Sequence, residues 1–390
     1  MDSGFAVAAG ETPEVAPGSV TLIGKRQYLH FAATLVLLLG ACPLAAAARL
    51  RLDGPLYLFG QMLPPLVAQA IFLAAVLYTV AYPHEAIGRI RAGDPRRFLF
   101  LIPLAILMFY LYRWRDALML TIAAIATVEF VLFSKRVRAA ASFLLPAVYF
   151  VIGFWVVYKY NDIIAVFRFY GAYDQFFSQM DSRLLLGHSV SELGHRAAAA
   201  MPQWFFPFLE AIYYGTFAQV GAGIIVVGLQ AGMVRAFRLV GTILLAYYAT
   251  VLCFFLWPSH GPYLLCQNHF ATFSNALSSY TVQQVFLENV KNLWQHAGVV
   301  ISTGGYYISF PCMHLTQPLI VLWFLRQSKR MVVALAIYDL VLCAAIVLLE
   351  WHYLVDLIGG AIVAVAAIWL TAQSDGQRRL DGESTGCELV

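Results

Sequence analysis

Two histidines are the side chains best suited to chemistry, because each lies beside residues that can position it. His352 stands four residues before Asp356, so on a helix the carboxylate can hold one nitrogen of the imidazole and leave the other free to attack. His314 follows Pro311 where a loop enters an apolar stretch, and the free amides of such a first helical turn suit a phosphate. A histidine there can give a proton to a leaving oxygen. Taken singly, the first pattern also fits a structural ion pair, and the second fits a polar helix cap.

The cysteine pattern gives no indication of a metal site. The six cysteines form no CxxC pair, which disfavours a zinc site or a thioredoxin-like motif. We expect no metal and no cofactor, because no residues have the sequence spacing of metal ligands. Cys312 lies between Pro311 and His314. No general base accompanies it in the sequence, so a nucleophilic role is not expected.

The composition is that of a membrane protein. Hydrophobic residues make up 61% of the 390-residue chain and charged residues only 12%, whereas soluble domains carry about 25% charged residues. Apolar stretches long enough to cross a hydrocarbon core of about 30 Å recur along the chain. They predict an all-α, polytopic membrane protein of about ten spans. The expected spans are 28–48, 56–82, 98–113, 117–134, 140–160, 204–234, 239–257, 313–325, 331–350 and 353–372.

The basic residues predict how these spans are oriented. With ten spans, the main lysine and arginine clusters all fall on one side, which the positive-inside rule makes cytoplasmic. Both termini are then cytoplasmic, and the residues that could do chemistry are extracytoplasmic. The net charge of +4 is small and lies in these clusters, which disfavours nucleic-acid binding. High alanine and arginine usage favours a bacterial inner membrane.

Together, the two histidine motifs resemble those of the type 2 phosphatidic acid phosphatase superfamily, in particular its inositol phosphorylceramide synthase-like branch. The matching segments are 309–314 (SFPCMH) and, one helical hairpin later, 352–356 (HYLVD). The resemblance implies a six-helix phosphatase-like core in the C-terminal half. It also implies that His352 is the nucleophile that forms a phosphohistidine, that Asp356 orients it, and that His314 protonates the departing alcohol.

This resemblance completes the expected organisation of the chain. The N-terminal five spans lie outside it. The divisions are 1–27, a disordered cytoplasmic tail; 28–160, N-terminal transmembrane helices; 161–203, an extracytoplasmic amphipathic segment; 204–372, a catalytic transmembrane core; and 373–390, a disordered cytoplasmic tail.

The sequence departs from the superfamily pattern where cations should meet the phosphate. The segment 257–263 (WPSHGPY) has no lysine or arginine, Ile346 stands where an arginine is expected, and Cys312 replaces a small hydroxyl residue. The predicted substrate-binding residues are therefore Ser309, His260, Tyr263, Lys291 and Arg168, with Arg183 as a further cation.

The leading functional hypothesis is a lipid phosphotransferase that acts on sphingolipids or phospholipids. Its partners would be a lipid-phosphate donor, an alcohol acceptor and the bilayer. A lipid phosphate phosphatase is the near alternative, since water or an alcohol can attack a phosphohistidine. From other classes, a transporter or flippase remains open, as does an inactive protein that binds lipid phosphate.

Overall fold

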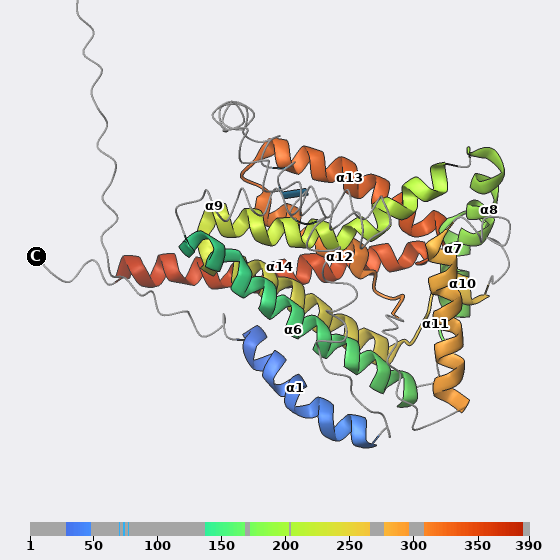
Figure 1. Ribbon diagram of the computed structural model, residues 1–390, viewed down its shortest axis with the longest axis horizontal. Helices are drawn as coiled ribbons and strands as arrows, with labels where there is room; N and C mark the ends of the chain where they lie inside the picture. The colour runs from blue at the N-terminus through green and yellow to red at the C-terminus, as the bar shows by residue number, and fades with distance from the viewer. Residues whose placement is uncertain are drawn as a thin grey trace, which may run out of the picture.

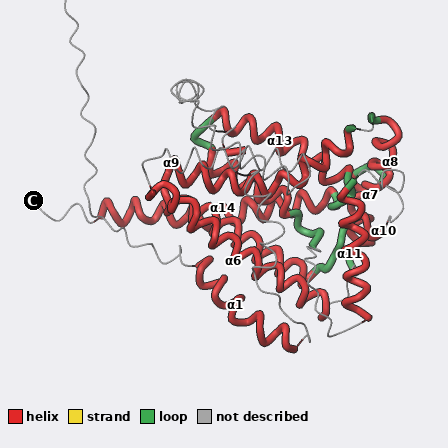
Figure 2. Tube along the Cα trace, viewed as in Figure 1, coloured by secondary structure: helices red, strands yellow, loops and turns green. Residues whose placement is uncertain are grey.

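The structure is a computed structural model of the whole chain, and its described residues are 29–47, 70, 73–74, 77, 137–167, 172–202, 204–265, 277–295 and 308–384. Within these residues every regular element is a helix, which confirms the all-α prediction there (Figure 2). The helices are α1 (Leu29–Ala47), α6 (Val137–Phe167), α7 (Asp174–Leu184), α8 (Val190–Ala200), α9 (Phe205–Leu256), α10 (Pro262–Leu265), α11 (Ser278–Gln295), α12 (Met313–Leu325), α13 (Lys329–Leu348) and α14 (Leu354–Ser384).

Four of the described helices contain a segment long and apolar enough to cross a membrane: Ser142–Ala165, Phe205–Leu256, Lys329–Leu348 and Leu354–Ala372. Shorter apolar segments occur in α1 and α12. Large apolar side chains point outward at helical spacing on α13 (Val333, Ile337, Leu340), as expected of a lipid-facing surface. The predicted spans at 98–113 and 117–134, and most of 56–82, lie outside the described residues.

Helix α9 reverses direction at Gly232, so that it supplies two arms of the bundle. Gly232 has φ 82° and ψ 172°, which is not helical and is readily adopted by glycine. The ring of Phe154 on α6 contacts both Phe217 and Tyr247, which are 30 residues apart on either side of this turn. The two arms therefore lie side by side, and they correspond to the spans 204–234 and 239–257 that the sequence predicts, with the reversal a few residues earlier than predicted.

The bundle is built around α9, which packs against α6, α12, α13 and α14 (Figure 1). Short helices α7, α8 and α10 pack against one another at one end of it, where α14 begins. Helix α14 continues to Ser384, so residues 373–384 are helical here, whereas the sequence predicts a disordered tail from 373. The polar composition after Thr371 marks the end of the apolar segment but does not end the helix.

Candidate active site

Three chain segments meet at the end of the bundle that carries α7: the turn after α9, the segment before α12, and the turn between α13 and α14. The amide of Ser309 donates to the carbonyl of Ser259 at 3.1 Å, which joins the first two segments. The amide of Cys312 donates to the carbonyl of Asp356 at 3.0 Å, which joins the second to the third. Backbone hydrogen bonds thus hold both predicted histidine motifs together.

The two predicted histidines face each other inside this end of the bundle. Nδ1 of His314 lies 3.2 Å from Nε2 of His352, and the residues are 8% and 3% exposed. The other nitrogen of His352, Nδ1, lies 2.8 Å from the carbonyl oxygen of Ser309. A carbonyl can only accept, so Nδ1 carries a proton and Nε2 is the nitrogen that faces His314.

Asp356 is fully buried, and its side chain bonds to Ser309 and to the Tyr353 amide, the two residues next to His352. Its Oδ2 accepts hydrogen bonds from the hydroxyl of Ser309 and, at 2.9 Å, from the amide of Tyr353. The same oxygen is 3.5 Å from Nδ1 of His352, longer than an ordinary hydrogen bond. Because α14 begins at Leu354, His352 lies in the turn before the helix, and the carbonyl of Ser309 is the closer partner of its ring.

Aromatic rings from α9 and from the turn before α14 pack around His314. Tyr213 stacks on His314 with ring centroids 4.4 Å apart, and on Trp351 with centroids 5.1 Å apart. Phe217 meets the same imidazole edge-on at 5.9 Å. These rings limit the rotation of His314, since a shifted imidazole would collide with them.

Helix α7 covers the site and is attached by two buried aspartates that the sequence prediction missed. Asp181 accepts from the amides of Leu354 and Val355, the first two residues of α14, at 2.7 and 2.9 Å. Asp174 accepts from the amides of His260 and Gly261 and from the Tyr353 hydroxyl.

One signal could have identified this pair. The two aspartates are seven residues apart with Phe177 between them, so all three share one face of the helix. Phe177 stacks on Phe310 with centroids 4.8 Å apart, which brings that face onto the segment before α12.

Burial changes the pKa values of the two α7 aspartates and of His352. Burial raises the pKa of Asp174 to about 7 and that of Asp181 to about 6, even though their hydrogen bonds from backbone amides act in the opposite direction. Burial lowers the pKa of His352, but Cys312 and Asp356 beside it favour the charged ring, and the net effect raises that pKa to about 10. A proton is therefore available between the two histidine rings at neutral pH.

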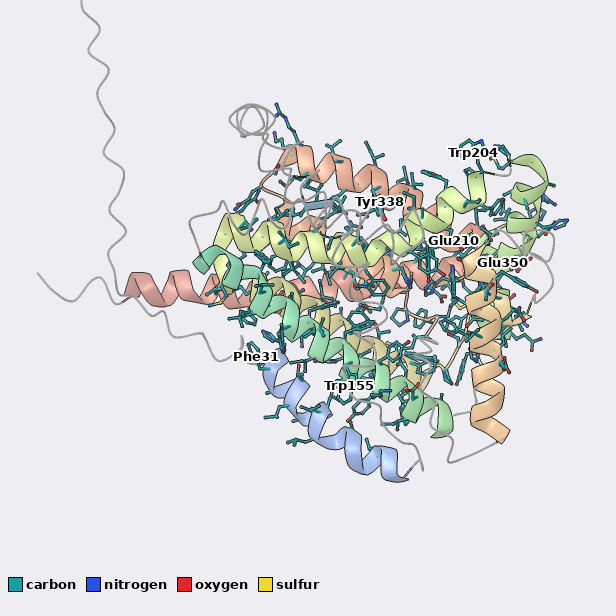
Figure 3. The ribbon with its side chains drawn as sticks, viewed as in Figure 1. Phe31, Trp155, Trp204, Glu210, Tyr338 and Glu350 are labelled. Atoms are coloured by element: carbon teal, nitrogen blue, oxygen red, sulfur yellow. The ribbon has the colours of Figure 1, made fainter. Side chains whose placement is uncertain are left out.

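The turn between α13 and α14 is conformationally unusual. Glu350 has φ 57°, which non-glycine residues seldom adopt, and it is buried beside α8. Ser191 of α8 hydrogen bonds to its side chain, and burial raises its pKa to about 7. Glu210, a polar residue in the apolar first part of α9, accepts from the amide of Ser279 at the start of α11. Figure 3 shows both glutamates at the end of the bundle where α8 and α11 lie.

The first-turn amides of α12 and α14 differ in their partners. Those of α14 are taken by Asp181, as described above. Helix α12 begins at Met313 with Cys312 as its N-cap, and no side-chain cap hydrogen bond is made there. Pro311 therefore precedes the helix, whereas the sequence pattern suggested that it would occupy the first helical turn. The start of α12 is the place at which His314 and His352 converge.

Of the other predicted binding residues, some are buried near the site, one is exposed, and two have side chains that lie outside the described residues. His260 is 3% exposed and its ring meets that of Tyr263 edge-on, and Tyr263 in turn packs against Trp351. Lys291 lies in α11, but its side chain is outside the described residues, as is all of Arg168. Arg183 lies exposed in the last turn of α7. In the described part of the chain, no lysine or arginine bonds to His314, His352 or Asp356.

The structure also assembles a group of side chains that the sequence spacing did not reveal. Cys312, His314 and His352 are all buried, and their ligand atoms lie within 4.8 Å of one another. His352 is distant in sequence from the other two, which is why no metal-ligand spacing is visible in the sequence.

The described helices suit a membrane-spanning bundle, and two buried histidines face each other at one end of it. A family model described as the PAP2 superfamily matches residues 175–370, which is half of the chain. The match begins in the first turn of α7 and ends within α14. The protein belongs to the PAP2 superfamily and is a phosphatase or phosphotransferase that acts on lipid phosphates. Comparisons with curated proteins and with solved structures give no match.

Proposed function

We propose that this protein is a lipid phosphotransferase of the inositol phosphorylceramide synthase-like branch, working through a phosphohistidine on His352. The observation that carries the proposal is the 3.2 Å approach of His314 Nδ1 to His352 Nε2 in a buried site. Two histidines that face each other can act on the two sides of one phosphorus, as nucleophile and as acid to its leaving oxygen, once the substrate has entered between them.

The first step is a proton transfer within the pair. The proton shared by the rings passes from Nε2 of His352 to Nδ1 of His314, while the Ser309 carbonyl keeps the other proton on Nδ1 of His352. This single transfer creates both the nucleophile and the acid. A 3.2 Å contact leaves no room for a phosphoryl group, so the rings separate when the substrate enters.

The second step transfers the phosphorus. Nε2 of His352 forms a bond to phosphorus as the bond from phosphorus to the lipid oxygen breaks, and His314 gives its proton to that oxygen. An acceptor alcohol then attacks the phosphohistidine and returns a proton to His314. Because α7 covers the site, water has restricted access, which favours an alcohol acceptor over hydrolysis. Hydrolysis by a lipid phosphate phosphatase is the alternative outcome of the same intermediate.

The phosphate itself is held mainly by dipoles. We assign it to the start of α12, where the first-turn amides carry the positive end of the helix dipole and where the two histidines converge. Ser309, His260 and Tyr263 are the proposed polar contacts around it. Lys291 and Arg168 remain proposed sources of positive charge.

The proposal extends to the whole chain. The chain then has ten spans, with a six-helix phosphatase-like core in its C-terminal half at 204–372. Its termini, 1–27 and 373–390, are cytoplasmic, and 161–203 forms an extracytoplasmic cover. The membrane is the inner membrane of a bacterium. This topology predicts that a membrane-impermeant thiol reagent labels a cysteine placed at Asn268 but not one placed at Ser328.

The test is the product formed by purified protein from labelled phospholipids, with and without ceramide or diacylglycerol, resolved by thin-layer chromatography and mass spectrometry. His352→Ala and His314→Ala are compared with His188→Ala, a matched control whose histidine pairs with Glu192 on the protein surface. A new headgroup-bearing lipid that requires His352 and His314 but not His188 supports a transferase. Free phosphate with the same dependence supports a phosphatase. Turnover that survives in His352→Ala would refute the phosphohistidine.

A further inference from the structure

We infer that Cys312, His314 and His352 form a binding site for one Zn²⁺ ion, and that the ion inhibits the enzyme reversibly. The three residues come from the start of α12 and the turn before α14, and their ligand atoms lie within 4.8 Å of one another. Thiolate and imidazole are the ligands that zinc prefers among protein side chains.

The distances suit a tetrahedral ion. Zinc–nitrogen bonds of about 2.0–2.1 Å place two nitrogens of a tetrahedron about 3.3 Å apart. Nδ1 of His314 and Nε2 of His352 are 3.2 Å apart, so the two nitrogens already have the separation that one ion requires. Cys312 at the N-cap of α12 then closes the third position.

The surroundings of His352 provide a second, independent indication. Histidines that bind metals nearly always donate their other ring N–H to a backbone carbonyl or carboxylate, which fixes the tautomer. Nδ1 of His352 lies 2.8 Å from the Ser309 carbonyl, with the Asp356 carboxylate behind it at 3.5 Å. Nε2 is thereby presented to the ion.

Zinc binding and turnover exclude each other. The ion would occupy the lone pair on Nε2 of His352 that must attack phosphorus. Three protein ligands leave a fourth position, which water or a phosphate oxygen can fill. The inhibition part of this inference rests on the proposed function, whereas the binding part does not. The thiol in place of the expected hydroxyl is what makes this site selective for a soft metal.

Binding is measured first, on purified full-length protein freed of any histidine tag. Zn²⁺ is titrated in competition with a chromophoric chelator, and Cd²⁺ is titrated in parallel to record the ultraviolet thiolate-to-metal band. Cys312→Ser is compared with Cys253→Ser, a matched control at a half-buried free cysteine on α9. We expect one Zn²⁺ per chain in the wild type and in Cys253→Ser, and an affinity at least about tenfold lower in Cys312→Ser, which also loses the Cd²⁺ band.

Inhibition is measured second, with each variant referred to its own zinc-free rate. The Zn²⁺ concentration that halves turnover should rise at least about tenfold in Cys312→Ser and stay unchanged in Cys253→Ser, and a chelator should restore the rate. His314→Ala, checked for folding by its thermal unfolding, should lose binding in the same way. Equal zinc affinity in Cys312→Ser and Cys253→Ser would overturn the site. If no lipid is turned over, the proposed function fails, but the binding measurement still decides the metal site.

Discussion

Replacing Gly261 by alanine tests how the backbone around the site places His352. Gly261 has φ +122°, and a Cβ built there lies 2.5 Å from the carbonyl oxygen of Trp351, whereas ordinary contact begins at 3.4 Å. The Trp351 carbonyl must therefore retreat by about 1 Å, because backbone cannot turn aside as a flexible side chain does. Trp351 directly precedes His352, so the displacement reaches the proposed nucleophile.

The expected effect falls on the chemical step. A misplacement of about 1 Å costs about 100-fold in rate, so kcat should drop by about that factor while KM changes little. The strained backbone should also lower stability by about 1–3 kcal/mol. Turnover is measured as the initial rate on the best lipid substrate, and stability as the Tm in detergent.

Gly187→Ala is the matched control. Gly187 also has a positive φ, +97°, but a Cβ there meets no atom within 4 Å. It should therefore lower the Tm without changing kcat. Turnover of Gly261→Ala within about threefold of that of Gly187→Ala would refute the argument that this close contact positions His352.

Three further predictions concern the cover, the aromatic stack and the bundle. Since burial raises the pKa of Asp174 from 3.8 to about 7, the docking of α7 is strongest below pH 4 and weakens as the pH rises through about 7. Hydrogen exchange, corrected for intrinsic rates, should show α7 less protected at pH 8 than at pH 5, and Asp174→Asn should flatten that trend; protection that increases with pH would contradict it. Tyr213→Ala should lower turnover about tenfold and Tyr213→Phe should not, because an aromatic stack contributes about 0.5–1.5 kcal/mol and the phenylalanine ring preserves it. Gln219 donates to Asp339 at 2.9 Å between α9 and α13. Gln219→Leu leaves the buried Asp339 without this donor and should destabilise the bundle by about 1–3 kcal/mol in denaturant unfolding. The double variant Gln219→Leu/Asp339→Leu should recover most of that loss.

Hydropathy predicted the long apolar helices well, because the membrane requires long apolar segments whatever their partners. The predicted span 313–325 coincides with α12, and 331–350 differs from α13 by two residues at each end. The reversal inside α9 was placed a few residues late, since nothing but Gly232 marks it within an apolar run. Hydropathy could not predict the helical extension to Ser384, because it detects spans and not helices in water.

The candidate site was predictable only where the functional residues occur in short motifs. His314, His352, Asp356 and Ser309 lie in two such motifs, and the structure brings all four together. Asp181 bonds to residues more than 170 positions away, so its role depends on how α7 packs against α14. Such a contact leaves no local signal beyond the shared face of an amphipathic helix.

Both aspartates of α7 bind main-chain amides, and this has a consequence for how the enzyme can diversify. Side chains at 260, 354 and 355 can change without removing these bonds, since at those positions Asp174 and Asp181 bond to the peptide groups. Asp174 also accepts from the Tyr353 hydroxyl, so that side chain is part of the attachment. Only a proline at one of these positions would remove the N–H on which the attachment depends. The side chains at these three positions are therefore free to vary while α7 stays attached over the two histidines.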